Sequence, residues 1–307
     1  MSMPAPCVPP RTAVARGSVA LAALVAASAG VTAPLAAQRE RATVRVEHFA
    51  GTSTALPPGS VAGEDVSQQM LQITAAHRLV RQHGNTILLL GGQWRGVRAE
   101  LPRASAQARV RVQPGVSTLH VAAAELMLLR TFDDRHTLVS VLRPGLYGEA
   151  VRVEGAAFVD RIVSARTTIG AGLSYASSFG QLLPIPVVHV VSRPSRRLLV
   201  DALLPARGDL WWMPRKGLDL GLSASLVGAQ YGLSTAQHVA EGTDLWLANA
   251  TLGPQVRWAP WGGKWQLSGE GGLTVLRRLE YARDGRSVAD LAPGNVPYLR
   301  LGAQRLF

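Results

Sequence analysis

The sequence is poor in cysteine, in lysine and in long apolar runs. Its one cysteine, Cys7, lies in an N-terminal segment that we expect to be removed, which excludes a disulfide framework, thiol catalysis and a cysteine-ligated metal in the mature chain. Beyond that segment there is no apolar run of about 18 residues, so no membrane-spanning helix is expected. Lysine occurs only at Lys216 and Lys264, and arginine supplies the other positive charges.

The formal net charge of +12 favours anionic partners such as acidic lipids, anionic solutes or nucleic acid. The arginines are scattered, however, and no basic helix or zinc-finger pattern accompanies them. Nucleic acid is therefore not expected as a partner.

The N-terminus has the three parts of a secretory signal. Arg11 and Arg16 precede an apolar stretch over 18–31, and small residues follow it. We place the cleavage near Ala37, which gives a signal peptide over 1–37 and one domain over 38–307. No linker or internal repeat divides that domain.

Strict alternation of apolar and polar residues marks three strands, over 217–226, 246–258 and 265–275. One face is predicted to meet lipid and the other to line a lumen. The lipid-facing set is Leu218, Leu220, Leu222, Leu226, Trp246, Leu252, Trp258, Trp265 and Leu273, and the lumen set is Asp219, Ser223, Asn249, Gln255, Gln266 and Glu270.

Weaker patterns predict further strands, and Pro or Gly occupies many of the joins between them. A helical turn is an alternative over 159–166. The weaker strands are 41–49, 67–81, 84–94, 116–130, 136–146, 167–177, 184–192, 197–204, 208–214 and 297–307.

Two features favour a membrane barrel over a soluble exported β-sandwich that acts as a binding module. The alternating strands are long enough to cross a bilayer at a tilt. Aromatic residues also lie near strand ends, as at Trp211, Trp212, Tyr231, Trp246 and Trp258. The prediction is an all-β chain with a single closed antiparallel transmembrane barrel over about 41–307 and about 12 strands.

The C-terminal segment 295–307 ends on Phe307, with Leu299 and Leu301 on the same face. This ending resembles that of bacterial outer-membrane β-barrels. The resemblance implies location in the outer membrane, contact with its lipid and lipopolysaccharide, and recognition of the final strand by the barrel assembly machinery. Arg305 departs from the pattern because it falls on the apolar face, where its charge has to reach the headgroups.

Residues 165–307 also resemble an uncharacterised family of outer-membrane barrels, a domain of unknown function. The resemblance is carried by Pro184 and Pro186, by a short strand that closes on Leu204 and Pro205, and by a Gly-rich strand that ends at Tyr231. The family supplies no catalytic residues.

No pattern of an enzyme or of a cofactor site is present. The seven histidines show no metal-ligand spacing, and GLSYA at 172–176 lacks the second Gly of a nucleophile elbow. We therefore expect no enzyme and no catalytic, cofactor-binding or metal-binding residues. The alternative is a barrel-wall hydrolase in which Ser223 or Ser225 faces His189.

These observations favour an outer-membrane barrel that is a structural element or a narrow, porin-like channel for small solutes. A barrel of this size is expected to be narrow or partly plugged. Arg257, Arg278 and Arg300 fall on polar faces and suggest a mild preference for anions.

Overall fold

The computed structural model describes residues 41–49, 68–101, 115–177, 183–233, 243–260, 264–291 and 294–306. The predicted signal peptide over 1–37 and Phe307 lie outside these residues. The described residues form no helix that is long and apolar enough to cross a membrane.

Within the described residues the chain is an antiparallel sheet of fifteen strands, which confirms the all-β prediction. The alternative of a helical turn over 159–166 is wrong, because that stretch is the end of a strand and a tight turn. The strands are β1 (Arg41–Phe49), β2 (Gln68–His83), β3 (Thr86–Leu101), β4 (Gly115–Thr131), β5 (His136–Tyr147), β6 (Ala150–Ser164), β7 (Thr167–Ala176), β8 (Leu183–Ser195), β9 (Leu198–Leu204), β10 (Arg207–Arg215), β11 (Leu218–Gly232), β12 (Thr243–Trp258), β13 (Trp265–Arg283), β14 (Arg286–Leu291) and β15 (Pro297–Leu306).

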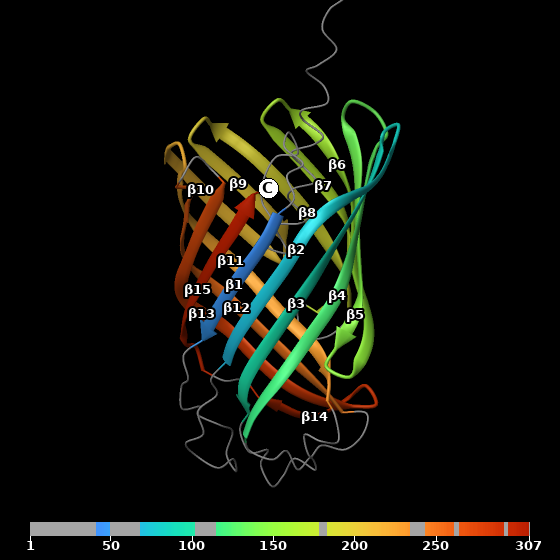
Figure 1. Cartoon of the computed structure of the whole chain (residues 1–307), viewed down its shortest axis with the longest axis vertical. Helices are drawn as coiled ribbons and strands as arrows, with labels where there is room; N and C mark the ends of the chain where they lie inside the picture. The colour runs from blue at the N-terminus through green and yellow to red at the C-terminus, as the bar shows by residue number, and fades with distance from the viewer. Residues whose placement is uncertain are drawn as a thin grey trace, which may run out of the picture.

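The strand pairings run around the molecule and return to the first strand (Figure 1). Each strand from β1 to β13 pairs with its neighbour in the chain, β13 pairs with β15, and β15 pairs with β1. The far half of β13 pairs with β14, so β14 and β15 share one edge of β13. All described strands belong to one sheet, which disagrees with the two separate sheets of a sandwich.

The strand number is higher than the expected value of about 12. The sequence patterns missed β6 and β14. Several connections are also tight turns of two residues, such as 165–166 and 196–197, and β9 has only 7 residues. Less chain is therefore needed for each strand than a typical membrane strand and turn would use.

The two faces of the C-terminal strands agree with the predicted alternation. The lipid-facing set includes Leu222, Leu252 and Leu273, whose side chains are 52–57% exposed. Trp258 and Trp265 are also exposed. In the predicted lumen set, Ser223, Asn249, Gln255 and Glu270 are buried at 1–8% exposure. The remaining members of both sets are half-buried.

One charged residue, Arg278, lies on the face opposite to the one expected, and two of the aromatic residues near strand ends face the interior. Trp211 and Tyr231 are buried in the interior instead of joining an outer girdle. Arg278 turns away from the interior because the pairing of β12 with β13 shifts by one residue, from Ala250 opposite Leu276 to Thr251 opposite Thr274. Such a bulge exchanges the two faces of a strand beyond it.

The two ends of the sheet differ. The C-terminus and the start of β1 lie at the end drawn uppermost, where the turns 84–85, 165–166, 196–197 and 216–217 are short (Figure 1). The three longest connections, over 50–67, 102–114 and 233–242, leave from strands at the opposite end.

An apolar cluster, called the cap below, fills the interior at the end with the long connections. It brings β2, β3 and β4 into contact with β11, β12 and β13 across the molecule. The turn between β5 and β6 joins it, because Gly148 pairs with Gly232 and Glu149 N donates to Gly232 O. The buried members of the cap are Met70, Val97, Ala99, Leu119, Val121, Tyr147, Ala229, Tyr231, Leu233, Leu245, Leu247, Leu279 and Tyr281.

The outward orientation of Leu222 generates the first prediction. Leu222→Arg is expected to lower the free energy of unfolding by about 2 to 4 kcal/mol if the residue lies at the bilayer midplane. Leu218→Arg, nearer the end of the same strand, should cost only about 0 to 1 kcal/mol. Urea titrations in lipid vesicles measure both values. Equal stability of Leu222→Arg and wild type would show that this face does not meet hydrocarbon.

Candidate functional site

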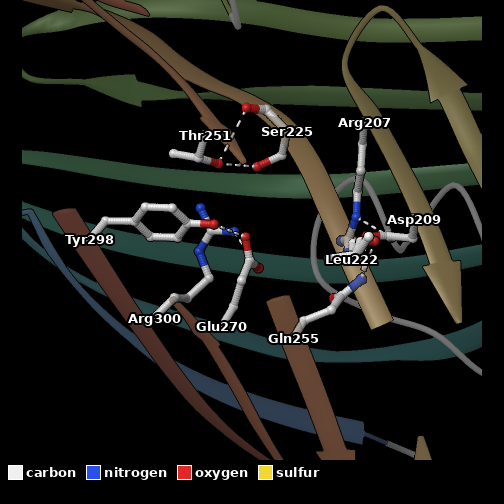
Figure 2. Close-up of polar contacts among 9 residues, drawn as sticks. All are labelled: Arg207, Asp209, Leu222, Ser225, Thr251, Gln255, Glu270, Tyr298 and Arg300. Atoms are coloured by element: carbon white, nitrogen blue, oxygen red, sulfur yellow. Dashed lines mark hydrogen bonds and ion pairs between the residues drawn. The ribbon is translucent and has the colours of Figure 1, made fainter. Parts of the chain in front are cut away.

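The inward faces of β12, β13 and β15 carry a hydrogen-bonded group centred on Glu270 (Figure 2). Tyr298 Oη donates to Glu270 Oε1 at 2.7 Å, and Arg300 Nη1 donates to Glu270 Oε2 at 2.7 Å. The register explains the contact, since Glu270 is directly opposite both Gln255 and Arg300 on the neighbouring strands. Both carboxylate oxygens thus have a donor.

A second polar group lies on β10 and β12 (Figure 2). Arg207 Nε is 2.5 Å from Asp209 Oδ2, and Gln255 Nε2 donates to Asp209 Oδ1 at 2.8 Å. Gln255 also donates to Leu222 O at 3.1 Å. The hydroxyls of Ser225 and Thr251 are 2.8 Å apart on β11 and β12. Polar residues therefore line this side of the interior.

The opposite side of the interior carries further paired charges that the sequence patterns did not identify. Arg143 Nε donates to Glu125 Oε2 at 2.5 Å, and Ser177 N donates to Glu154 Oε1 at 3.0 Å. His189 Nδ1 is 2.7 Å from Asp160 Oδ1. Two of these residues, Glu154 and Asp160, are on β6, a strand that the sequence patterns missed.

The predicted lumen residues enter this interior to different extents. Ser223, Gln255 and Glu270 lie among the polar groups, and Asn249 Nδ2 donates to Gln68 Oε1 at 2.9 Å. Arg257 is stacked on the Trp211 ring, with its guanidinium carbon 3.6 Å from the ring centre. Arg143, Arg207 and Arg300 are thus held by carboxylates, and Arg257 by an aromatic face.

A cavity of about 110 Å³ lies between the two walls. It is bordered by the cap through Val227 and by a second apolar cluster through Val141, Val187 and Leu203. Its lining residues are Val141, Arg143, Glu154, Gly155, Ala156, Ser174, Ala176, Val187, Leu203, Ala206, Arg207, Ser225, Leu226, Val227 and Arg300.

The geometry gives no support to a hydrolase built on His189 and Ser223 or Ser225. β9 and β10 lie between β8 and β11 in the sheet, and no hydrogen bond joins His189 to either serine among the described contacts. His189 is instead paired with Asp160. Among the residues that the structure describes, no group of three or more His, Cys, Asp or Glu is placed to hold a metal ion. The absence of catalytic and cofactor-binding residues stays a prediction.

Comparison with known proteins gives neighbours in structure only. No protein-family model and no curated protein sequence matches the chain, so the resemblance over 165–307 to an uncharacterised family stays unconfirmed. The toluene transporter TodX of Pseudomonas putida has a TM-score of 0.46 at 8% identity, covering 95% of this chain and 94% of that one.

Two other solved structures are similar at a lower level. An outer membrane channel of Pseudomonas putida F1 has a TM-score of 0.43 at 12% identity, covering 88% of this chain and 96% of that one. The β domain of the Bordetella autotransporter BrkA has a TM-score of 0.35 at 13% identity, covering 88% and 100%. All three TM-scores are below one half, so the fold is assigned from the strand pairings of this chain alone.

The Glu270 group generates the second prediction. Glu270→Gln leaves the buried guanidinium of Arg300 without its carboxylate, and the loss of one partner of such a pair costs about 3 to 5 kcal/mol. The unfolding midpoint in urea should fall accordingly. The double variant Glu270→Gln, Arg300→Met should recover a large part of the loss, because no isolated charge remains inside. If both variants lose the same stability, the two side chains are not coupled.

Proposed function

We propose that the chain is a closed outer-membrane β-barrel that forms a narrow channel for small solutes, after removal of residues 1–37. The observation that carries the proposal is the division of the sheet into an apolar outer face and an interior with paired charges. A soluble protein of this size rarely exposes so much contiguous apolar surface. A membrane barrel requires it.

The outer face supports a bilayer environment in detail. Large apolar side chains are exposed along strands on every side of the sheet, among them Leu71, Leu126, Val159, Leu173, Leu210, Leu252 and Leu301. Trp212, Trp258 and Trp265 are exposed near the end where β1 begins and β15 ends. Arg305 lies over the Trp265 ring, 5.6 Å from its centre, where its charge can reach a headgroup layer.

The connections suggest the orientation. Bacterial barrels have short periplasmic turns and longer extracellular loops. The three longest connections leave from the end with the cap, which is therefore assigned to the cell exterior, and the end where β1 begins and β15 ends is assigned to the periplasm. Lipid and lipopolysaccharide would then surround the outer face.

The interior suggests how a channel would behave. The cap occupies the outer end of the lumen, so we expect a low conductance in the resting state. Arg143, Arg207 and Arg300 line the cavity beneath it, whereas Glu154 is its one acidic lining residue. This excess of guanidinium groups at the cavity surface supports a mild preference for anions.

Conductance in planar bilayers tests the channel. The double variant Tyr231→Ala, Leu245→Ala removes two large cap side chains and is expected to conduct several-fold better than wild type, with a reversal potential that favours chloride over potassium. Leu252→Ala, on the outer face of β12, is the matched control and should behave as wild type. Cation selectivity would contradict the preference for anions, and a cap variant that conducts no better than the control would remove the channel proposal.

Assembly provides a separate prediction, since Phe307 lies outside the described residues but follows directly on β15. We propose that the final strand is recognised by the barrel assembly machinery. Deletion of Phe307 should then cause unfolded protein to accumulate in the periplasm, while the same chain still folds in micelles. The mobility of unheated samples in detergent gels separates the folded and unfolded forms. Normal assembly of the deletion variant in cells would exclude a role for Phe307.

A further inference from the structure

The lining of the cavity beneath the cap combines guanidinium groups with apolar side chains. A solute that contacts both kinds of side chain has a charged end and an apolar end. Arginines approach it from three different strands, with Arg143 on β5, Arg207 on β10 and Arg300 on β15. Apolar side chains also line it, including Val187 and Leu203 from the second apolar cluster.

Each of the three arginines is held from behind by a carboxylate that does not itself line the cavity. The partners are Glu125 for Arg143, Asp209 for Arg207 and Glu270 for Arg300. This arrangement fixes the guanidinium groups in place and offsets the cost of bringing three cations together. A solute in the cavity therefore contacts the three guanidinium groups and not their carboxylate partners.

Arg143 has donors left for a ligand. Among the described residues, its one hydrogen bond uses Nε, and its side chain keeps 20% of its surface accessible although the residue faces the interior. A guanidinium group presents two parallel N–H donors in the geometry that a carboxylate accepts. Glu154, the acidic residue in the lining, already accepts from Ser177 N and Ser177 Oγ.

We infer that this cavity binds a short-chain monocarboxylate, with the carboxylate on Arg143 and the hydrocarbon chain against Val187 and Leu203. The cavity of about 110 Å³ is smaller than the cavity of roughly 150 Å³ that holds benzene in an engineered protein core, so a chain of about three to five carbons matches its volume. The inference rests on the proposed channel, because the ligand would be a solute in its lumen.

The test uses butyrate, its neutral isostere butyramide and the cation butylammonium with the mature protein folded in micelles. Saturation-transfer difference NMR measures the three affinities. Butyrate should bind at least about tenfold more tightly than butyramide, the difference expected for one charge-assisted hydrogen bond. Butylammonium should bind no better than butyramide. Equal affinities for butyrate and butyramide, or tighter binding of butylammonium, would overturn the assignment.

Variants locate the site. Arg143→Met combined with Glu125→Gln removes the charge pair as a unit and should weaken butyrate binding about tenfold or more. Arg152→Met combined with Asp244→Asn is the matched control, because this ion pair lies outside the cavity lining. Ala176→Leu fills the cavity, leaves every charge in place and should also abolish binding. Unchanged affinity in the Arg143 or the Ala176 variant, with folding verified by gel mobility, would show that butyrate binds elsewhere.

Binding and transport fail independently in this design. Binding in micelles requires no flux, and flux of small anions into liposomes requires no saturable site. Butyrate binding without conductance would sustain the cavity assignment and contradict the channel. Conductance without butyrate binding would contradict the cavity assignment and leave the channel standing.

Discussion

The pairing of β1 with β15 is the interaction on which the rest of the structure depends. Their register runs from Arg41 opposite Leu306 to Phe49 opposite Tyr298, and β1 pairs with β2 on its other side. Without this contact, two edges of unpaired N–H and C=O groups would face the surroundings, at a cost of several kcal/mol for each group in hydrocarbon. With this contact, β15 and each strand from β1 to β13 have a paired strand on both sides.

Continuous pairing also separates the two faces of the strands. Because side chains alternate along each strand, one set points outward and the other meets across the interior. The outward set is apolar at positions such as Leu222 and Leu299. The inward set contains the cap, the polar groups around Glu270 and Asp209, and the second apolar cluster. The cavity lies where these regions meet, which is why its lining is mixed.

The sequence permitted the faces of β11, β12 and the first half of β13 to be predicted because their alternation is strict. Leu222, Ser223 and Glu270 all lie on the expected side. Arg278 could not be placed in this way, since a one-residue bulge that no local residue type announces reverses the alternation beyond Leu276. The face of Trp211 could not be predicted for a different reason: Trp211 and Trp212 are adjacent, so only one of them can face outward.

The charged interior was less predictable than the outer face. Glu125 and Arg143 are 18 residues apart in the sequence, and only the register of β4 with β5 brings them together. The cap depends on contacts between β2–β4 and β11–β13 that are still more distant in the chain. Patterns of period two report which face a residue occupies, but they contain no information on which strands meet across a lumen.

Oxidative cross-linking tests the closure of the sheet most directly. In a Cys7→Ser background, Val44→Cys and Ala303→Cys place two thiols at directly opposed positions of β1 and β15, where the short Cα separation permits a disulfide. Val44→Cys with Leu299→Cys is the control, because Leu299 is opposite His48 instead. The account predicts a disulfide in the first variant and none in the second, seen as a mobility difference between reduced and unreduced denatured samples. Absence of the disulfide in the folded first variant, or equal cross-linking of both, would contradict the closed sheet.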